Sequence, residues 1–112
     1  VLDQRVWKLN PQFFTYTLSK AALFTATQTL AQSFAPNIRV NGIGPGPTLK
    51  SVHQSEEEFA AERTATLTQE GSRPEEIVRA LRYLIEADSV TGQMIATDGG
   101  QHLMWQTPDT QV

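Results

Sequence analysis

The order in which helical and extended patterns alternate constrains this chain of 112 residues more than any other feature. Val1-Leu2-Asp3 reads as the end of an apolar strand, and an Ala- and Leu-rich helical pattern follows over about 15–34. The later predicted elements are a strand at 38–43, helices at 56–68 and 74–87, and a strand at 93–97. Two successive strand–helix–strand crossovers predict an α/β fold with a parallel sheet and helices on its faces. Such a sheet needs further strands, which we expect to belong to a longer protein.

Local signals set these boundaries. Pro36 ends the first helix because a helix interior does not accept proline. Ser55 followed by Glu58 is a capping-box pattern that begins the second helix. Pro74 is typical of the first turn of the third helix. The run Gly44-Pro-Gly-Pro47 predicts a loop directly after the middle strand.

The spacing of apolar residues predicts which helix faces are buried. In the first helix the predicted core face comprises Leu23, Ala26, Leu30 and Phe34. Further Ala and Phe residues widen that face, so we expect burial on two sides, against the sheet and against another helix or subunit. In the third helix the predicted core face comprises Ile77, Val78, Leu81, Leu84 and Ile85.

Composition excludes several classes of function. Twelve Asp and Glu against nine Lys and Arg give a formal charge of −3, so there is no basic field for nucleic acid. The absence of cysteine excludes a disulfide scaffold and fits a reducing, cytoplasmic compartment. No apolar run approaches the roughly 20 residues that span a bilayer. His53 and His102 have no companions at ligand spacing, so we expect no metal site.

Tyr16 and Lys20 are the strongest candidates for chemistry from the residues alone. Four residues apart on a helix, they share one face, a turn apart. A free phenol has a pKa near 10, and a neighbouring ammonium lowers that pKa and makes tyrosine a better proton shuttle. The same lysine can donate hydrogen bonds to a sugar diol. Taken alone, a tyrosine and a lysine on one helix face are more often two surface residues, so the surrounding sequence must support a catalytic role.

That context is a set of four segments: Tyr16-Thr-Leu-Ser-Lys20-Ala-Ala-Leu, Ile38-Arg-Val-Asn-Gly-Ile-Gly-Pro45-Gly46, Val90-Thr-Gly-Gln and Asp98-Gly-Gly. In this order and spacing they resemble the C-terminal half of a short-chain dehydrogenase/reductase. The resemblance implies a Rossmann fold, a doubly wound parallel sheet that binds NAD(P). Residues 1–112 would then be the C-terminal part of a single NAD(P)-binding domain, with 48–72 as a substrate-loop excursion. The family's Gly-rich phosphate turn does not occur in this sequence, so we expect this stretch alone to be inactive.

The resemblance also implies roles for three residues. Tyr16 would donate a proton to the substrate, and Lys20 would bind the nicotinamide ribose and depress the pKa of Tyr16. Thirteen residues before the tyrosine the family usually has Ser, whereas this chain has Asp3. A carboxylate accepts a hydrogen bond from a ring N–H or amino group, and pteridine reductases of this family resemble the chain here. The segment from Glu75 to Ile85 is likewise similar to the dihydromonapterin and dihydrofolate reductase branch.

A second set of candidates surrounds these residues. Pro45, Gly46 and Thr48 resemble the family loop that meets the nicotinamide carboxamide, although Pro47 departs from it by lacking an N–H. Trp7 is a candidate to stack a flat heterocycle, with core packing as the alternative.

Other residues read as structural. Phe13 and Phe14 are expected to pack in the core, Arg39 and Asn41 to serve the end of the sheet, and Asp98 to accept backbone N–H groups in a turn.

The sequence thus predicts an oxidoreductase of the short-chain type that reduces a pteridine-like substrate with NADPH, or alternatively with NADH. Two other interpretations stay open: a family member acting on another carbonyl or alcohol, and a catalytically silent Rossmann-like binding or assembly module. We expect a homodimer or homotetramer formed through the first helix, with Ala26 or Ala31 near the symmetric contact. No nucleic acid, membrane or metal partner is expected.

Overall fold

Two parallel strands form the centre of the structure, a computed structural model that describes residues 1–110. They are β1 (Gly42–Pro45) and β2 (Met94–Thr97), paired in register from Gly42 with Met94 to Pro45 with Thr97. The backbone N–H of Leu2 donates a 2.7 Å hydrogen bond to the carbonyl of Ile43, so the first residues lie against β1. The predicted α/β fold with parallel strands is confirmed.

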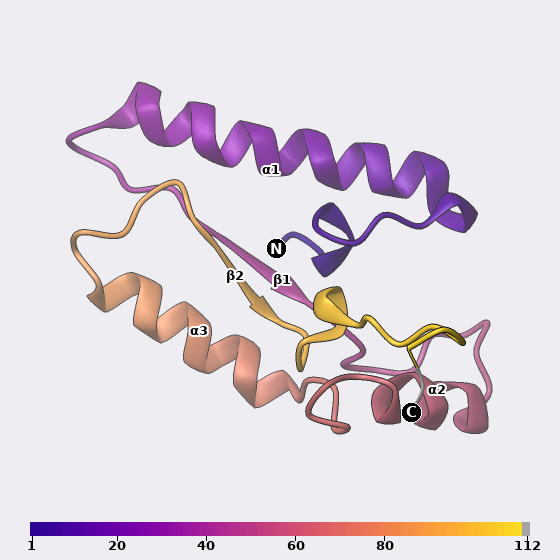
Figure 1. The fold of residues 1–112 in the computed structure, drawn as a ribbon. Coiled ribbons are helices and arrows are strands. Elements are labelled where there is room, and N and C mark those ends of the chain that lie inside the picture. The colour runs from indigo at the N-terminus through magenta and orange to yellow at the C-terminus, as the bar shows by residue number, and fades with distance from the viewer. Residues whose placement is uncertain (111–112) are drawn as a thin grey trace.

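Three helices surround these strands. They are α1 (Phe14–Phe34), α2 (Glu56–Thr64) and α3 (Pro74–Glu86). Three short 3-10 turns complete the fold: η1 (Gln4–Val6), η2 (Pro11–Phe13) and η3 (Gln101–Leu103). In Figure 1, α1 and α3 lie on either side of the strands, while α2 lies beyond the strand ends. This is the crossover arrangement that the alternating pattern predicts.

The strand β1 begins four residues later than predicted, and Gly44 and Pro45, which we expected in a loop, belong to it. The segment before it is held by side-chain bonds together with a 2.7 Å backbone bond from the N–H of Gly92 to the carbonyl of Val40. The amide of Asn41 donates to the carbonyl of Val90 at 2.8 Å and accepts from the N–H of Gln93 at 3.0 Å. These bonds satisfy the backbone carbonyl of Val90 and the backbone N–H of Gln93, which would otherwise pair with a neighbouring strand.

Arg39 holds the same end of the sheet. Its guanidinium donates to the carbonyls of Leu84, Ile85 and Val90 at 2.8–3.0 Å. Two of these carbonyls lie in the last turn of α3, where backbone acceptors have no partner within the helix. The expectation that Arg39 and Asn41 serve the sheet end is confirmed.

The predicted start of α2 is confirmed in detail. The Glu58 N–H donates to the Ser55 hydroxyl at 3.0 Å, and the Ser55 N–H donates to the Glu58 carboxylate at 3.3 Å. The helix ends at Thr64, four residues earlier than predicted. The buried hydroxyl of Thr66 donates to the carbonyl of Arg63 and accepts from the N–H of Gly71, which turns the chain out of the helix.

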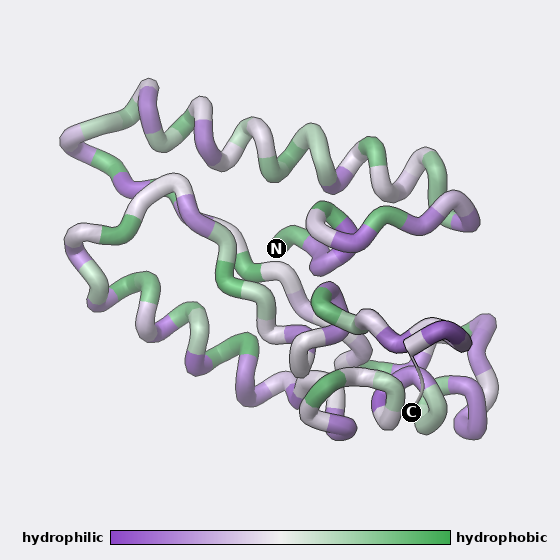
Figure 2. The backbone as a smooth tube through the Cα atoms, viewed as in Figure 1, coloured by the Kyte–Doolittle hydropathy of each residue, from purple (hydrophilic) through white to green (hydrophobic). Residues whose placement is uncertain are grey.

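The core of this chain is small and differs from the predicted one. Its buried members are Ile43, Ala80 and Leu84, with Ile77, Val90 and Ile95 packed beside them. On α3, three predicted core residues, Val78, Leu81 and Ile85, are exposed. The two strands cover only part of the apolar helix faces, which Figure 2 shows along α1 and α3.

The buried face of α1 is also different from the predicted one. Its buried residues are Thr17, Thr27 and Ala31, whereas the predicted Leu23, Leu30 and Phe34 are exposed. Small side chains let α1 approach the chain beneath it, and the Thr27 hydroxyl donates to the carbonyl of Leu23 within the helix. Phe14, also expected in the core, is 68% exposed.

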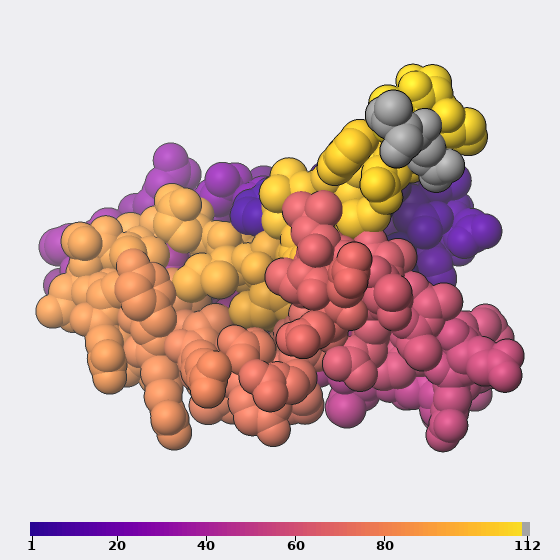
Figure 3. All heavy atoms as spheres, turned by 60° about the horizontal axis from the view of Figure 1, so that its bottom comes forward, coloured from indigo at the N-terminus to yellow at the C-terminus, as the bar shows by residue number. Residues whose placement is uncertain are grey.

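Residues 104–110, which follow η3, extend away from the rest of the molecule in the view of Figure 3. Over the described residues, no helix combines the length and the hydropathy needed to cross a membrane.

Candidate functional site

Tyr16 and Asp3 meet at the beginning of α1. The Tyr16 hydroxyl donates a 2.9 Å hydrogen bond to Oδ2 of Asp3. A second hydrogen bond holds the Asp3 carboxylate, because its Oδ1 caps η1 by accepting from the N–H of Arg5 at 2.9 Å. The cap orients the carboxylate so that its second oxygen faces the phenol. The structure thus brings together two of the candidate residues that the sequence singled out.

Lys20 lies one turn along the same helix. Its Nζ donates to the carbonyl of Val1 at 3.1 Å and lies 5.7 Å from the centroid of the Tyr16 ring. The lysine thereby ties α1 to the first residues of the chain, which lie beside β1.

The pKa of Tyr16 is raised to about 12. Burial is the largest cause, followed by the hydrogen bond to Asp3 and the negative charge of Asp3, while Arg5 opposes them. The expectation that Lys20 depresses this pKa is wrong for this structure, because Asp3 contacts the hydroxyl directly and Lys20 contacts Val1. Tyr16 is therefore protonated at neutral pH and can act as a proton donor.

A cavity of about 820 Å³ opens beside this pair. It is lined by both Asp3 and Tyr16 and also by three residues expected to meet the nicotinamide, Pro45, Gly46 and Thr48. These residues come from the chain start, from α1 and from the end of β1, so their convergence depends on the fold. The volume lies within the range usual for small-molecule sites.

Gly46 is required by close packing. A Cβ at this position would lie 2.7 Å from the Cβ and 2.8 Å from the Cα of Asp98. The next residues are held as well: the Thr48 hydroxyl donates to the carbonyl of Gly46 at 3.0 Å, and the Pro47 carbonyl accepts from Ser72 at 3.1 Å. This wall of the cavity is therefore a fixed loop.

Asp98 has the structural role that the sequence predicts. It is 1% exposed and accepts from the N–H groups of Gly100 and His102 at 3.0 and 2.9 Å. The His102 ring adds a contact from Nδ1 at 2.7 Å. These bonds shape the turn that packs against Gly46.

Trp7 and Phe13 lie differently from the expectation. Trp7 packs edge-to-face on Phe24 at 6.2 Å and lies 5.1 Å from the ring of His102, and it does not line the cavity. Phe13, expected in the core, does line it, with the Arg5 guanidinium 4.1 Å above its ring. Phe13 and Phe59 thus line the cavity, while Trp7, for which stacking and packing were both open, packs on Phe24.

The part of the cavity that sequence reasoning missed comes largely from the excursion after β1. Its polar members include Gln54, Glu58 and Glu62. The carboxylate of Glu62 accepts from the Gln54 amide at 2.6 Å and from the Gln101 amide at 3.5 Å. No local pattern signals that α2 faces Tyr16, because the contact joins segments far apart in the sequence.

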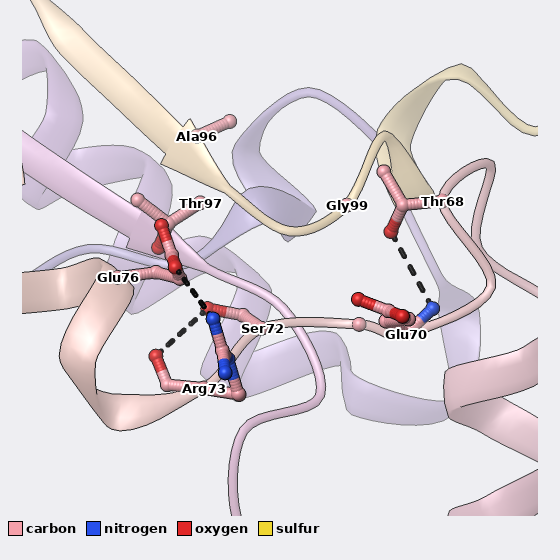
Figure 4. Close-up of a pocket in the computed structure, with 9 residues that line it drawn as sticks. Thr68, Glu70, Ser72, Arg73, Glu76, Ala96, Thr97 and Gly99 are labelled. Carbon is pink, nitrogen blue, oxygen red and sulfur yellow. Dashed lines mark hydrogen bonds and ion pairs between the residues drawn. The ribbon is translucent and has the colours of Figure 1, made fainter.

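A second cavity, of about 350 Å³, lies elsewhere and is shown in Figure 4. Its lining includes Ser72, Arg73 and Thr97. The Arg73 guanidinium is paired with Glu76 at 3.3 Å. None of the candidate catalytic residues lines this cavity, so it is not the candidate active site.

Comparison with known proteins agrees with the geometry. A family model described as enoyl-(acyl carrier protein) reductase matches residues 4–102. A short-chain dehydrogenase/reductase homolog, YusR of Bacillus subtilis, is 35% identical over 89 residues, covering 79% of this chain and 69% of the relative. Dihydromonapterin reductase of Escherichia coli is 31% identical over 101 residues, covering 90% of this chain and 42% of the relative.

Two solved structures are more similar in sequence. FolM alternative dihydrofolate reductase 1 of Brucella suis, in complex with NADP, is 59% identical with a TM-score of 0.92 over 96% of this chain. Its Brucella canis counterpart, also complexed with NADP, is 58% identical with a TM-score of 0.93 over 98%. The chain spans 44% of each of these structures. It belongs to the short-chain dehydrogenase/reductase family.

Proposed function

We propose that the full-length protein reduces a pteridine-like substrate with NADPH. Residues 1–112 form the C-terminal part of its single nucleotide-binding domain, and 48–72 form the substrate loop. Support comes from the FolM structures complexed with NADP and from the dihydromonapterin reductase relative. The observation that carries the proposal is the hydrogen bond between Tyr16 and Asp3 on the wall of the 820 Å³ cavity.

The residues of this chain fit the nicotinamide end of the cofactor. Tyr16 and Lys20 place a hydroxyl and an ammonium on one helix face, a donor set suited to the two hydroxyls of a ribose. Pro45, Gly46 and Thr48 line the same cavity as Tyr16 and are candidates to meet the carboxamide. When bound, NADPH supplies the hydride. The phosphates would be held by residues outside this chain, which lacks the family's Gly-rich phosphate-binding turn.

Tyr16 holds the proton that the reduction consumes. Its raised pKa keeps the phenol protonated, and the hydrogen bond to Asp3 holds the hydroxyl in the cavity wall. It donates directly or through a water as negative charge develops on the substrate.

Asp3 orients the substrate. Its carboxylate accepts from a ring N–H or amino group, the donors that a pteridine presents and a simple ketone lacks. Substrate binding would exchange the present bond from Tyr16 for bonds to the ring.

The full-length protein also forms a homodimer or homotetramer through α1. The exposed Leu23, Leu30 and Phe34 supply an apolar surface for a second copy. Of the two alanines expected near the symmetric contact, Ala26 is half-buried, while Ala31 is 5% exposed and faces inward near Gly92. The contact is therefore assigned to the leucine face and not to Ala31. A cytoplasmic location stays a prediction from composition.

The direct test is a spectrophotometric assay of the purified full-length protein with a dihydropterin and either NADPH or NADH. We expect NADPH oxidation that depends on the dihydropterin. Reduction of an activated ketone with no dihydropterin activity would favour the alternative of another carbonyl substrate. Failure to bind any nicotinamide cofactor would favour a silent binding module.

A further inference from the structure

The wall of the candidate site that α2 provides is acidic. Glu58 and Glu62 line the cavity from α2, and Asp3 lines it from the chain start. Arg5 is the one Lys or Arg among the described lining residues. Three carboxylates against one guanidinium leave this cavity with an excess of negative charge.

Both α2 carboxylates are held in place. Glu58 accepts from the Ser55 N–H in the capping box at 3.3 Å. Glu62, which is half-buried, accepts from the Gln54 amide at 2.6 Å and from the Gln101 amide at 3.5 Å. Because these bonds join the carboxylates to residues 54–55 before the helix and to Gln101, their charges stay at the cavity wall.

The cavity has room for more than a ring. A two-ring heterocycle held at Asp3 and Tyr16 fills only part of 820 Å³, and much of the remaining lining comes from residues 48–62. A side chain on the ring therefore extends along the wall that carries Glu58 and Glu62.

We propose that Glu58 and Glu62 determine substrate specificity by repelling substrates with an anionic side chain and so favouring pterins with a neutral one. The inference rests on the proposed function. It goes further by distinguishing between two pteridine substrates, dihydrofolate and dihydromonapterin, which the proposed function does not separate. Dihydrofolate ends in a glutamate with two carboxylates, whereas dihydromonapterin carries only hydroxyls.

The expected effect follows from Coulomb's law. Repulsion between two like unit charges about 6 Å apart in water lowers the affinity for an anionic substrate by about threefold. The carboxylates of Glu58 and Glu62 together therefore lower it by about tenfold. Salt reduces the effect, because the screening length falls from roughly 10 Å at 0.1 M to 3 Å at 1 M.

The test compares kcat/KM for dihydromonapterin and dihydrofolate in the full-length protein. Glu58→Gln and Glu62→Gln remove the charges but keep hydrogen-bonding groups of the same shape, and glutamine still supports a capping box. Glu57→Gln is the matched control, since this exposed residue of α2 does not line the cavity. Each variant removes one negative charge from the same helix.

We expect the wild type to have the higher kcat/KM for dihydromonapterin. In the double variant this preference should fall about tenfold, mainly because the KM for dihydrofolate decreases. The loss should be small at 1 M salt and absent in Glu57→Gln. An unchanged preference in the double variant, or an equal change in Glu57→Gln, would overturn the inference while leaving pterin reduction intact. Reduction of neither pterin would overturn the proposed function and this inference with it.

Discussion

The hydroxyl of Tyr16 donates a 2.9 Å hydrogen bond to Oδ2 of Asp3, thirteen residues earlier in the chain. The contact joins the residue that resembles the family's proton donor to the position where this chain departs from the family's usual serine. Burial is the largest cause of the raised pKa of Tyr16, and the hydrogen bond and negative charge of Asp3 raise that pKa further.

Tyr16→Phe removes the hydroxyl and keeps the ring. In the full-length protein we expect NADPH binding to persist and turnover to fall by about 100-fold or more, the usual range for a positioned acid. Single-turnover kinetics and a cofactor titration measure the two effects separately. Unchanged turnover would contradict the proton-donor role.

Asp3→Asn removes the charge beside Tyr16. Because the hydrogen bond and charge of Asp3 raise the pKa of Tyr16, we expect that pKa to fall from about 12 toward the ordinary tyrosine value. Ultraviolet titration of tyrosinate would follow the change as a transition at lower pH. Tyr83→Phe in the same background removes the other tyrosine of this chain from the signal. A transition that stays at the wild-type pH would show that burial alone sets the pKa.

Much of the fold could be predicted because its signals are local. The capping box at Ser55 and the proline in the first turn of α3 locate two helix starts from neighbouring residues alone. The start of β1 could not be predicted, since residues 38–41 are held partly by side-chain bonds such as that from Asn41 to Val90, about fifty positions away, beside a backbone bond from Gly92 to Val40. Alternation alone does not distinguish such a segment from a strand.

The buried faces were predicted less well for a related reason. Periodicity identifies apolar residues such as Leu23 and Leu81, but burial depends on what covers them. Over residues 1–110 the sheet is two strands wide, and both residues are exposed.

The candidate site, too, could be predicted only in part from the sequence. The spacing of Tyr16 and Lys20 on one helix and the position of Asp3 could be taken from the sequence. The contribution of Phe13 and Glu62 could not, because it depends on where the 3-10 turn and α2 lie relative to Tyr16.

Gly46→Ala tests the packing that fixes the loop after β1. The added Cβ would lie 2.7–2.8 Å from Asp98, whose backbone and short side chain must shift. We expect a loss of stability of about 1–3 kcal/mol, the usual cost of overpacking, visible as a lower Tm of the full-length protein. Gly44→Ala is the control, since its new Cβ meets the terminal Sδ and Cε of the flexible Met94 side chain at 2.8 and 3.0 Å, and a smaller loss is expected. Equal losses would contradict a special requirement at Gly46.

Charges on the exposed face of α1 test the proposed assembly. We expect the full-length wild type to be a dimer or tetramer at micromolar concentration, and Leu23→Glu with Leu30→Glu to shift it toward monomer. The exposed Gln28 offers a control, Gln28→Glu, that adds charge to the same helix. Light scattering gives the masses. A monomeric wild type would contradict assembly through this face.

Asp3→Ala, measured on two substrates, tests the pteridine assignment most directly. A hydrogen bond to a charged group contributes roughly 1.5–3 kcal/mol, so kcat/KM for a dihydropterin should fall by about 10- to 150-fold. An activated ketone, which offers no ring N–H, should lose much less, and Asp3→Ser should favour the ketone in relative terms. Equal losses on both substrates would mean that Asp3 acts on the fold or on Tyr16, and would contradict its role in holding a pteridine.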